Sequence, residues 1–460
     1  GRRYLEKNVE ETKARVILSE LDNIKGLHQD TIYTRHYPYH DLCSQVLGFL
    51  DEKNNPISGI ESYYDNILKG DSIKTRYVRD NFGALRIFEQ KRMANSNNDK
   101  KGATDLTLTI DIDIQSIFQN ELQKAVEESN AISGNGIIIE PFSGEIIAMA
   151  TVPSNNLNNR NNFVVKNSRN RAISDQYEPG STFKIIPMSA VLELGMYAPD
   201  DSIYCEEGEY DISESYGLPN KRIIYDHDPY DTLSVTEIIS NSSNIGISKI
   251  VSDLPDLVLY DYSKSFGFGE FHDIGLPLES PGVFHHPSSK SWYKESKPIV
   301  SIGQGITSTS LQMAVAYSAI ANDGKIMKPK IVKNTIEKDS GDLQVFESEV
   351  VRYVLTESTS TKIRNMLLEV VEDGTANNIM MNSIKIGGKT GTAQKAYNGK
   401  YSDEDFISSF ASIFPIDNPQ YVCIVAIDSP DKGKHWGNET AAPVVNKTVS
   451  KMVKENKIRL

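Results

Sequence analysis

A pair of apolar runs on either side of a short turn limits the folds open to this chain. The runs are Gly136-Ile-Ile-Ile-Glu140 and Glu145-Ile-Ile-Ala-Met-Ala-Thr151, and Pro141-Phe-Ser-Gly144 joins them. Apolar segments of this length around a Pro/Gly turn predict a buried β-hairpin. An alternating strand over 106–110 and an amphipathic helix over 114–128 come just before it. Because an apolar sheet must be covered by other elements, we expect a sheet with helices packed on it.

A hydroxyl and an amine lie three residues apart in Glu178-Pro-Gly-Ser181-Thr-Phe-Lys184. The Pro-Gly pair predicts a helix start, since the following apolar residues recur at helical spacing, and Ser181 and Lys184 then share one face. A helix N-terminus disfavours positive charge, so the pKa of a partly buried Lys184 falls toward that of a neutral base that can take a serine's proton. Ser291–Lys294 and Ser429–Lys432 have the same spacing. Spacing alone therefore does not single out one of the three pairs.

Two further segments combine polar side chains with an apolar or glycine-rich setting. Ser242-Ser243-Asn244 lies inside the helical pattern of residues 234–251, where polar groups either face solvent or line a site. Residues 384–394 predict a strand whose alternation leaves one polar face, and its glycines allow a ligand to approach the backbone closely. This strand carries Lys389, Thr390, Gly391 and Thr392.

The charge balance argues against a polyanionic partner. The chain has 49 Lys and Arg against 62 Asp and Glu, a net charge of −13, and no block dominated by Lys and Arg stands out. A phosphate-binding surface needs such a block, so nucleic acid is excluded as a partner. The three cysteines are far apart, and we expect free, mostly buried thiols.

Two groups of residues deserve comparison with metal sites. His36 and His40 flank Tyr-Pro-Tyr, and Cys205 precedes Asp226-His227-Asp228. Neither group offers a complete ligand set of suitable spacing. We expect surface or packing roles for the histidine pair and a structural hydrogen-bonded network for the second group.

The chain divides at a polar run, Asn95–Lys101, which suits a solvated linker. Residues 1–102 are rich in charge, with a short helix predicted over 9–21 and several short strand-like runs. Residues 103–460 hold the predicted hairpin at 136–151 and the segments of Ser181, Ser242 and Lys389, and they end in a second predicted hairpin and a closing helix over 441–453.

Membrane segments are not evident in the sequence. The longest uncharged stretch, Pro298–Asn322, contains too many Ser, Thr, Gln and Gly residues for a membrane span, and we expect it to form core and active-site lining. The chain opens at Gly1-Arg-Arg-Tyr4 without a signal peptide. We expect a longer natural protein with a membrane anchor before this start.

Ser181-x-x-Lys184, Ser242-x-Asn244 and Lys389-Thr390-Gly391 occur in the order of the triple signature of penicillin-recognising serine acyl-transferases. The chain resembles the class B penicillin-binding proteins, monofunctional peptidoglycan D,D-transpeptidases, and specifically the septal, cell-division type. Family-like segments recur over nearly its whole length: Arg35-His-Tyr-Pro38, Gln45-Val-Leu-Gly48, Ser58-Gly-Ile-Glu61, Leu108-Thr-Ile-Asp111, Gly144-Glu-Ile-Ile-Ala148, Asp175–Ser181, Gly303-Gln-Gly305 and Ala441-Ala-Pro443. Departures such as Glu140-Pro-Phe-Ser-Gly144, where Asp-Pro-x-Thr-Gly is usual, leave the motifs intact.

The resemblance implies an α+β fold. A transpeptidase domain over 103–460 would have a central antiparallel sheet sandwiched by helices, similar to serine β-lactamases, and an elongated α+β pedestal or dimerisation-like domain over 1–102 would precede it. The implied location is the inner membrane, held by one N-terminal anchor, with the catalytic domain in the periplasm. The implied partners are peptidoglycan stem peptides, β-lactam antibiotics, a membrane glycosyltransferase and division proteins, and no cofactor or metal is implied.

The resemblance also implies a role for each motif residue. Ser181 would attack the carbonyl between the last two D-alanines of a stem peptide, with Lys184 as general base. Ser242 would relay the proton, and Asn244 would hold Lys184 and the substrate amide. The backbone N–H groups of Ser181 and Thr392 would form the oxyanion hole. Lys389 would supply positive potential, Gly391 would admit the ligand, and the hydroxyls of Thr390 and Thr392 would bind the terminal carboxylate.

Several related functions remain open from the sequence. A serine β-lactamase shares the motifs but is usually far shorter and lacks a separate N-terminal domain. A D,D-carboxypeptidase differs in using water as the acyl acceptor, and a β-lactam-binding sensor would acylate without turnover. The N-terminal region could also act as an interaction scaffold beside catalysis.

Overall fold

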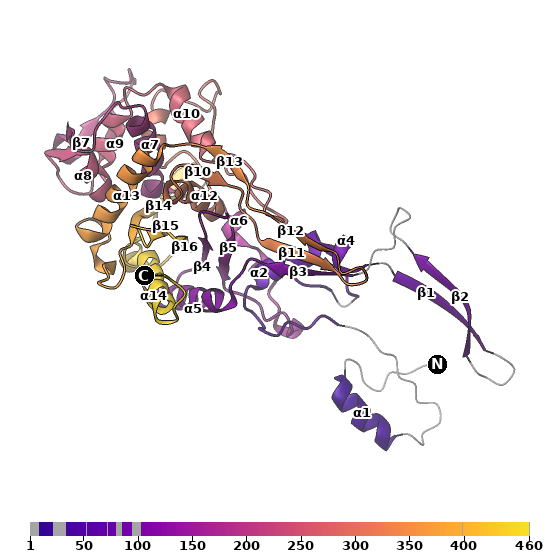
Figure 1. Ribbon diagram of the computed structural model, residues 1–460. Helices are drawn as coiled ribbons and strands as arrows, with labels where there is room; N and C mark the ends of the chain where they lie inside the picture. The colour runs from indigo at the N-terminus through magenta and orange to yellow at the C-terminus, as the bar shows by residue number, and fades with distance from the viewer. Residues whose placement is uncertain are drawn as a thin grey trace. The chain divides into compact units, whose positions relative to one another are not determined.

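The computed structural model of the protein describes residues 9–21, 34–51, 53–70, 72–79, 85–93, 103–397 and 399–459 (Figure 1). Its contacts group the chain into two compact units, Gly1–His36 and Tyr37–Leu460. In the first unit α1 spans Glu11–Glu20, which confirms the helix predicted there. The polar run at 95–101 lies outside the described residues.

The second unit begins with three short helices and a hairpin. The helices are α2 (Ser44–Leu47), α3 (Gly59–Tyr63) and α4 (Asp65–Leu68), and β1 (Ser72–Arg79) pairs antiparallel with β2 (Leu85–Met93). Within the residues before 102 that the structure describes, β1 and β2 are the strands that match the strand-like runs expected here. Cys43, Val46 and Ile60 join the main hydrophobic core, and the Cys43 N–H donates to Gln119 Oε1 at 3.0 Å. Residues before the polar run therefore pack on the elements that follow it.

A five-stranded antiparallel sheet forms the centre of this unit. Its strand order is β14-β15-β16-β4-β5. The bounds are β14 (Gly387–Tyr397), β15 (Lys400–Phe414), β16 (Tyr421–Asp428), β4 (Ser133–Ile139) and β5 (Ile146–Val152). The predicted hairpin at 136–151 is confirmed as β4 and β5, and all seven residues of β4 are buried. The predicted C-terminal hairpin is confirmed as β15 and β16.

Helices cover both faces of the sheet, as the apolar strands require. Gly134 and Gly136 of β4 face Leu122 and Phe118 of α5 (Ile112–Glu128), whereas Asn135 of β4 accepts a hydrogen bond from Ser310 of α12. Figure 1 shows α12 (Ser310–Ala321) on one side of the sheet and α5 with α14 (Ala441–Lys454) on the other. The observed layers confirm the sandwich of helices around an antiparallel sheet.

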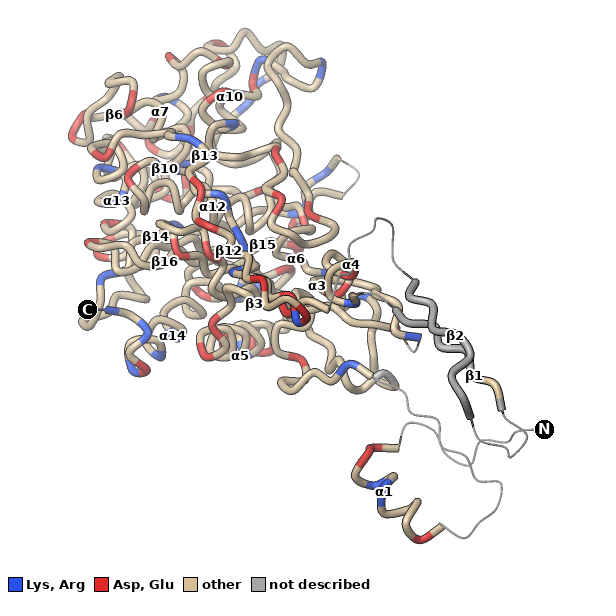
Figure 2. Tube along the Cα trace, turned by 45° about the vertical axis from the view of Figure 1, so that its right-hand side comes forward, with Lys and Arg blue, Asp and Glu red and all other residues tan. Residues whose placement is uncertain are grey.

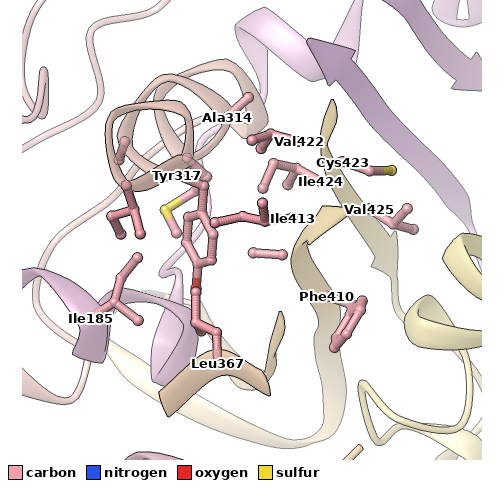
Figure 3. Close-up of a cluster of buried hydrophobic side chains, with 14 of the residues drawn as sticks. Ile185, Ala314, Tyr317, Leu367, Phe410, Ile413, Val422, Cys423, Ile424 and Val425 are labelled. Atoms are coloured by element: carbon pink, nitrogen blue, oxygen red, sulfur yellow. The ribbon is translucent and has the colours of Figure 1, made fainter. Parts of the chain in front are cut away.

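The buried helix α12 connects the core to the segment of Ser181. Every residue of α12 is buried, which confirms the expected core role for this part of the uncharged stretch Pro298–Asn322. Figure 3 shows Tyr317 of α12 among Ile185, Leu367 and Ile413, which come from α7 (Ile185–Glu193), α13 (Glu357–Glu372) and β15. The Tyr317 hydroxyl donates to the Thr182 carbonyl at 2.9 Å. The core therefore fixes the backbone next to Ser181.

The remaining elements are short and lie around this framework. The helices are α6 (Arg171–Ser174), α8 (Val235–Ser240), α9 (Asn244–Ile250), α10 (Asp256–Ser265) and α11 (Ser296–Ser301). The strands are β3 (Thr104–Leu108), β6 (Ser202–Tyr204), β7 (Glu209–Asp211), β8 (Ile223–Tyr225), β9 (Thr232–Ser234), β10 (Lys325–Met327), β11 (Val332–Glu337), β12 (Leu343–Val345) and β13 (Val350–Tyr353).

Surface charge and thiols agree with the sequence analysis. Figure 2 shows basic and acidic residues interspersed over the second unit. Cys43, Cys205 and Cys423 are free and buried, as expected. Among the helices of the described ranges, none combines the length and the apolar composition that crossing a bilayer requires.

Candidate active site

Ser181 lies in a tight turn that leads into α7. The 3-10 turn η3 spans Gly180–Lys184, so the predicted helix start is confirmed, with a tighter first turn. Gly180 has φ +54° and donates its N–H to the Gly303 carbonyl at 3.0 Å, a backbone conformation that favours glycine. Ser181 is partly exposed, whereas Thr182 and Lys184 are buried. Of these three side chains, that of Ser181 is therefore the one that solvent reaches.

Lys184 points across to the Ser242 segment. Its Nζ donates to the Ser242 carbonyl at 2.5 Å and to Asn244 Oδ1 at 2.7 Å, and lies 3.3 Å from Ser242 Oγ. Burial lowers the pKa of Lys184 to about 7, and the Asp226 carboxylate opposes this change. The predicted direction is confirmed, and burial is its largest cause. Within the described residues the Ser181 hydroxyl makes no hydrogen bond. The hydrogen-bond partners of Lys184 Nζ are therefore in Ser242 and Asn244.

The prediction of one helix over 234–251 is wrong, because the chain breaks at Ser242. α8 ends at Ser240, and Ser242 has a left-handed φ of +61°. The Ser243 side chain then accepts from the Gly246 N–H at 2.8 Å and caps α9. The break turns the Ser242 carbonyl and hydroxyl toward Lys184, an arrangement that a continuous helix does not allow.

Lys389 reaches the same hydroxyl from β14. Its side chain is fully buried, and its Nζ donates to Ser242 Oγ at 2.8 Å. Burial and the nearby Lys184 hold the pKa of Lys389 well below its usual range. Ser242 Oγ is therefore a shared partner of two buried amines, and each amine disfavours the charge of the other.

The alternation predicted for β14 is confirmed. Lys389 and Gly391 are buried, while Thr390 and Thr392 are partly exposed. A Cβ on Gly391 would lie 2.9 Å from the Pro179 carbonyl oxygen and 2.5 Å from Ser409 Oγ, so β14 approaches the Ser181 segment as only glycine permits. The strand β14 and the turn Gly180–Lys184 thus lie side by side.

Three residues that lie outside the three sequence motifs also contact the site. Thr375 Oγ1 lies 3.1 Å from Thr390 Oγ1, and the Gly437 N–H donates to Thr392 Oγ1 at 3.2 Å. Asp226 accepts hydrogen bonds from the start of α9. The structural network expected for Asp226 is confirmed, but its link to Asn244 required the fold.

The described residues contain no group of three or more His, Cys, Asp or Glu side chains arranged to hold a metal ion. His227 and Asp228 form an exposed pair at 3.1 Å, and Cys205 Sγ accepts from Ser243 Oγ at 3.7 Å.

The chain matches two protein-family models. Residues 134–450 match the penicillin binding protein transpeptidase domain, and residues 2–102 match the penicillin-binding protein dimerisation domain. The first match covers all the site residues above and the sheet from Gly134 onward.

Proteins that are similar to this chain are named peptidoglycan D,D-transpeptidases or penicillin binding proteins. The chain is 31% identical to a peptidoglycan D,D-transpeptidase FtsI homolog of Mesostigma viride, over 95% of this chain and 75% of that protein. It is 32% identical to the peptidoglycan D,D-transpeptidase FtsI of Buchnera aphidicola, over 95% and 73%. The crystal structure of penicillin binding protein 3 from Mycobacterium tuberculosis aligns with a TM-score of 0.79 and 28% identity, over 92% of this chain and 91% of that one, and the same protein is also known in complexes with aztreonam and ampicillin.

The fold, the meeting of the three motifs at the Ser242 hydroxyl and these similarities lead to one conclusion. The chain belongs to the class B penicillin-binding proteins, the monofunctional peptidoglycan D,D-transpeptidases of the septal type.

Proposed function

We propose that this chain cross-links peptidoglycan stem peptides through an acyl-enzyme on Ser181. The observation that carries the proposal is the convergence of Lys184 and Lys389 on the Ser242 hydroxyl beside the nucleophile turn. A lysine whose pKa is about 7 is neutral in half of the molecules near neutral pH and can accept a proton. This supports Lys184 as the general base.

The acylation step moves one proton and exchanges one bond. Ser181 Oγ attacks the carbonyl carbon of the penultimate D-alanine while Lys184 Nζ takes the hydroxyl proton. The C–N bond to the last D-alanine then breaks, and Ser242 relays the proton from Lys184 to the leaving nitrogen. Asn244 holds the Lys184 amine through its Oδ1 and keeps the substrate amide in place.

The strand β14 provides the binding wall in this proposal. Backbone N–H groups of Ser181 and Thr392 form the oxyanion hole, in which each donor is typically worth about 3 kcal/mol. Gly391 lets the peptide lie close to the strand, and the hydroxyls of Thr390 and Thr392 bind the terminal carboxylate. A bound carboxylate favours the charged form of Lys389, which then contributes positive potential.

An amine of a neighbouring stem peptide completes the reaction. It attacks the acyl-enzyme carbonyl, forms the cross-link and returns Ser181 as a hydroxyl. A β-lactam presents a similar carboxylate and a strained amide, so it acylates Ser181 as well. Its ring-opened leaving group stays attached and cannot diffuse away, which inhibits the enzyme.

The experiment is labelling with a fluorescent penicillin. We expect covalent labelling of the wild-type chain and none of Ser181→Ala, while Ser291→Ala and Ser429→Ala, the matched controls, label normally. Equal labelling of Ser181→Ala would refute the nucleophile. Rapid return of free enzyme from the adduct would instead indicate a β-lactamase.

We also propose the setting of this reaction. Residues 1–102 act as a pedestal or dimerisation-like domain and residues 103–460 as the transpeptidase domain, which the two family matches support. The domain works in the periplasm, because peptidoglycan lies there, and an N-terminal segment anchors the protein to the inner membrane. Its partners are a membrane glycosyltransferase and division proteins.

A further inference from the structure

Asp226 follows β8 and faces the first residues of α9. Its carboxylate accepts hydrogen bonds from the backbone N–H groups of Asn244 and Ile245, the latter at 3.0 Å, and from the Ser243 hydroxyl at 2.6 Å. The first N–H groups of a helix have no partner within the helix, so a carboxylate placed there stabilises the helix start. One side chain from a distant loop thus binds three groups of the segment that contains the Ser-x-Asn motif.

The Ser242 turn needs such a support. Ser242 adopts a left-handed φ of +61°, a conformation that is unfavourable for residues with a side chain and persists only when the surroundings hold it. The groups bound by Asp226 begin at the next residue. The adjacent Tyr225 carbonyl accepts from Asn244 Nδ2 at 2.8 Å, which directs Asn244 Oδ1 toward Lys184.

We propose that Asp226 is a positioning residue of the transpeptidase reaction, whose carboxylate fixes the turn that holds Ser242 and Asn244 against Lys184. The inference rests on the roles proposed above for these three residues. Asp226 acts through the turn and does not touch the substrate. Asp226 lies outside the three motifs, in the loop between β8 and β9.

The charge of Asp226 also acts on Lys184. Burial lowers the pKa of Lys184, and the Asp226 carboxylate raises it. Lys389 on β14 shares the Ser242 hydroxyl with this amine, and burial and then Lys184 hold the pKa of Lys389 well below its usual range. Asp226 therefore limits the fall of the pKa and keeps Lys184 a stronger base than burial alone would leave it.

The same loop offers a matched control. Asp228 is two residues away, is exposed, and bonds to His227 Nδ1 and the Tyr230 hydroxyl, both at 3.1 Å. Its hydrogen bonds within the described residues do not include the Ser242–Asn244 turn. Asp228→Asn thus changes the charge of the protein by the same amount as Asp226→Asn without touching the turn.

The test is the second-order rate constant for acylation by a fluorescent penicillin, measured from about pH 5 to about pH 9. Without the Asp226 charge, the charged form of Lys184 is less favoured, so the acid limb of Asp226→Asn moves to lower pH. Displacement of the turn lowers the plateau rate by about tenfold or more. Asp228→Asn is expected to follow the wild-type profile.

Two results would overturn the proposal. One is an Asp226→Asn profile that coincides with that of the wild type. The other is a lower plateau with an unmoved acid limb, which would reduce Asp226 to a residue that supports folding. Labelling of Ser181→Ala is read separately, so a failure of the proposed nucleophile is distinguishable from a failure of this inference.

A second variant keeps the test valid if Asp226→Asn does not fold, which a thermal unfolding curve would reveal. Ser243→Ala removes one of the three bonds to Asp226 together with the Ser243 cap of α9, and it keeps the Asp226 charge. We expect a lower plateau rate with the acid limb in its wild-type position. A wild-type plateau in a folded Ser243→Ala would contradict the coupling between the carboxylate and the turn.

Discussion

The two sides of the active site are built in different ways. The nucleophile side, named for the role proposed for Ser181, is the turn Gly180–Lys184, which is continuous with α7. The Pro-Gly pair before it and the apolar helix after it predict this turn, and Gly303 and Tyr317 also bond to its backbone. The opposite side, Ser242–Asn244, is a break between two helices held by Asp226, 18 residues before Asn244. The first motif is thus predicted by its local sequence, whereas the second interrupts a helical pattern and is bound by a carboxylate from another loop.

Lys184 is the link between the two sides, so its removal is the most severe test of the comparison. We expect Lys184→Ala to slow acylation by a penicillin at least about a hundredfold, because the general base is lost. Lys294→Ala and Lys432→Ala, from the other two Ser-x-x-Lys pairs, are the controls. A near-wild-type rate for Lys184→Ala would reject its role and leave the two sides independent.

A smaller effect is expected when β14 is forced away from the nucleophile side. The new methyl group in Gly391→Ala would meet the Pro179 carbonyl oxygen and Ser409 Oγ at 2.9 Å and 2.5 Å. A displacement of about 1 Å at a reacting centre lowers rates up to about a hundredfold, and we expect acylation to fall by at least about tenfold. Gly433→Ala is the control, since its methyl group meets no atom within 4 Å. Acylation rates that are equal for the two variants would show that the approach of β14 is not needed.

The mildest perturbation is a change of pH, which changes the protonation of Lys184 and leaves the sequences of both segments unaltered. The pKa of Lys184 is about 7 because burial disfavours its charged form, so the neutral base is present above pH 7 and is lost as the pH falls. Acylation of the wild type is expected to fall about tenfold for each pH unit below the pKa. A flat profile between about pH 5 and about pH 8 would contradict the assignment of Lys184 as the base.

The same contrast explains what the sequence predicts and what it does not. The hairpin at 136–151, the nucleophile turn and the alternation of β14 follow from local apolar patterns and glycines, and the structure confirms them. The break at Ser242 is missed, because isoleucines at helical spacing continue through it and the groups that interrupt the helix come from another loop. The contacts of Thr375 and Gly437 with β14 are likewise visible only once distant segments are folded together.

The central claim is that Ser181, alone among the three serines with a lysine three residues later, carries the acyl group. Mass spectrometry of the penicillin adduct tests it most directly. We predict an intact mass increased by one penicillin, a modified peptide that contains Ser181, and an adduct that persists. An adduct mapped to Ser291, Ser429 or any other residue, or no adduct on a folded protein, would contradict the account.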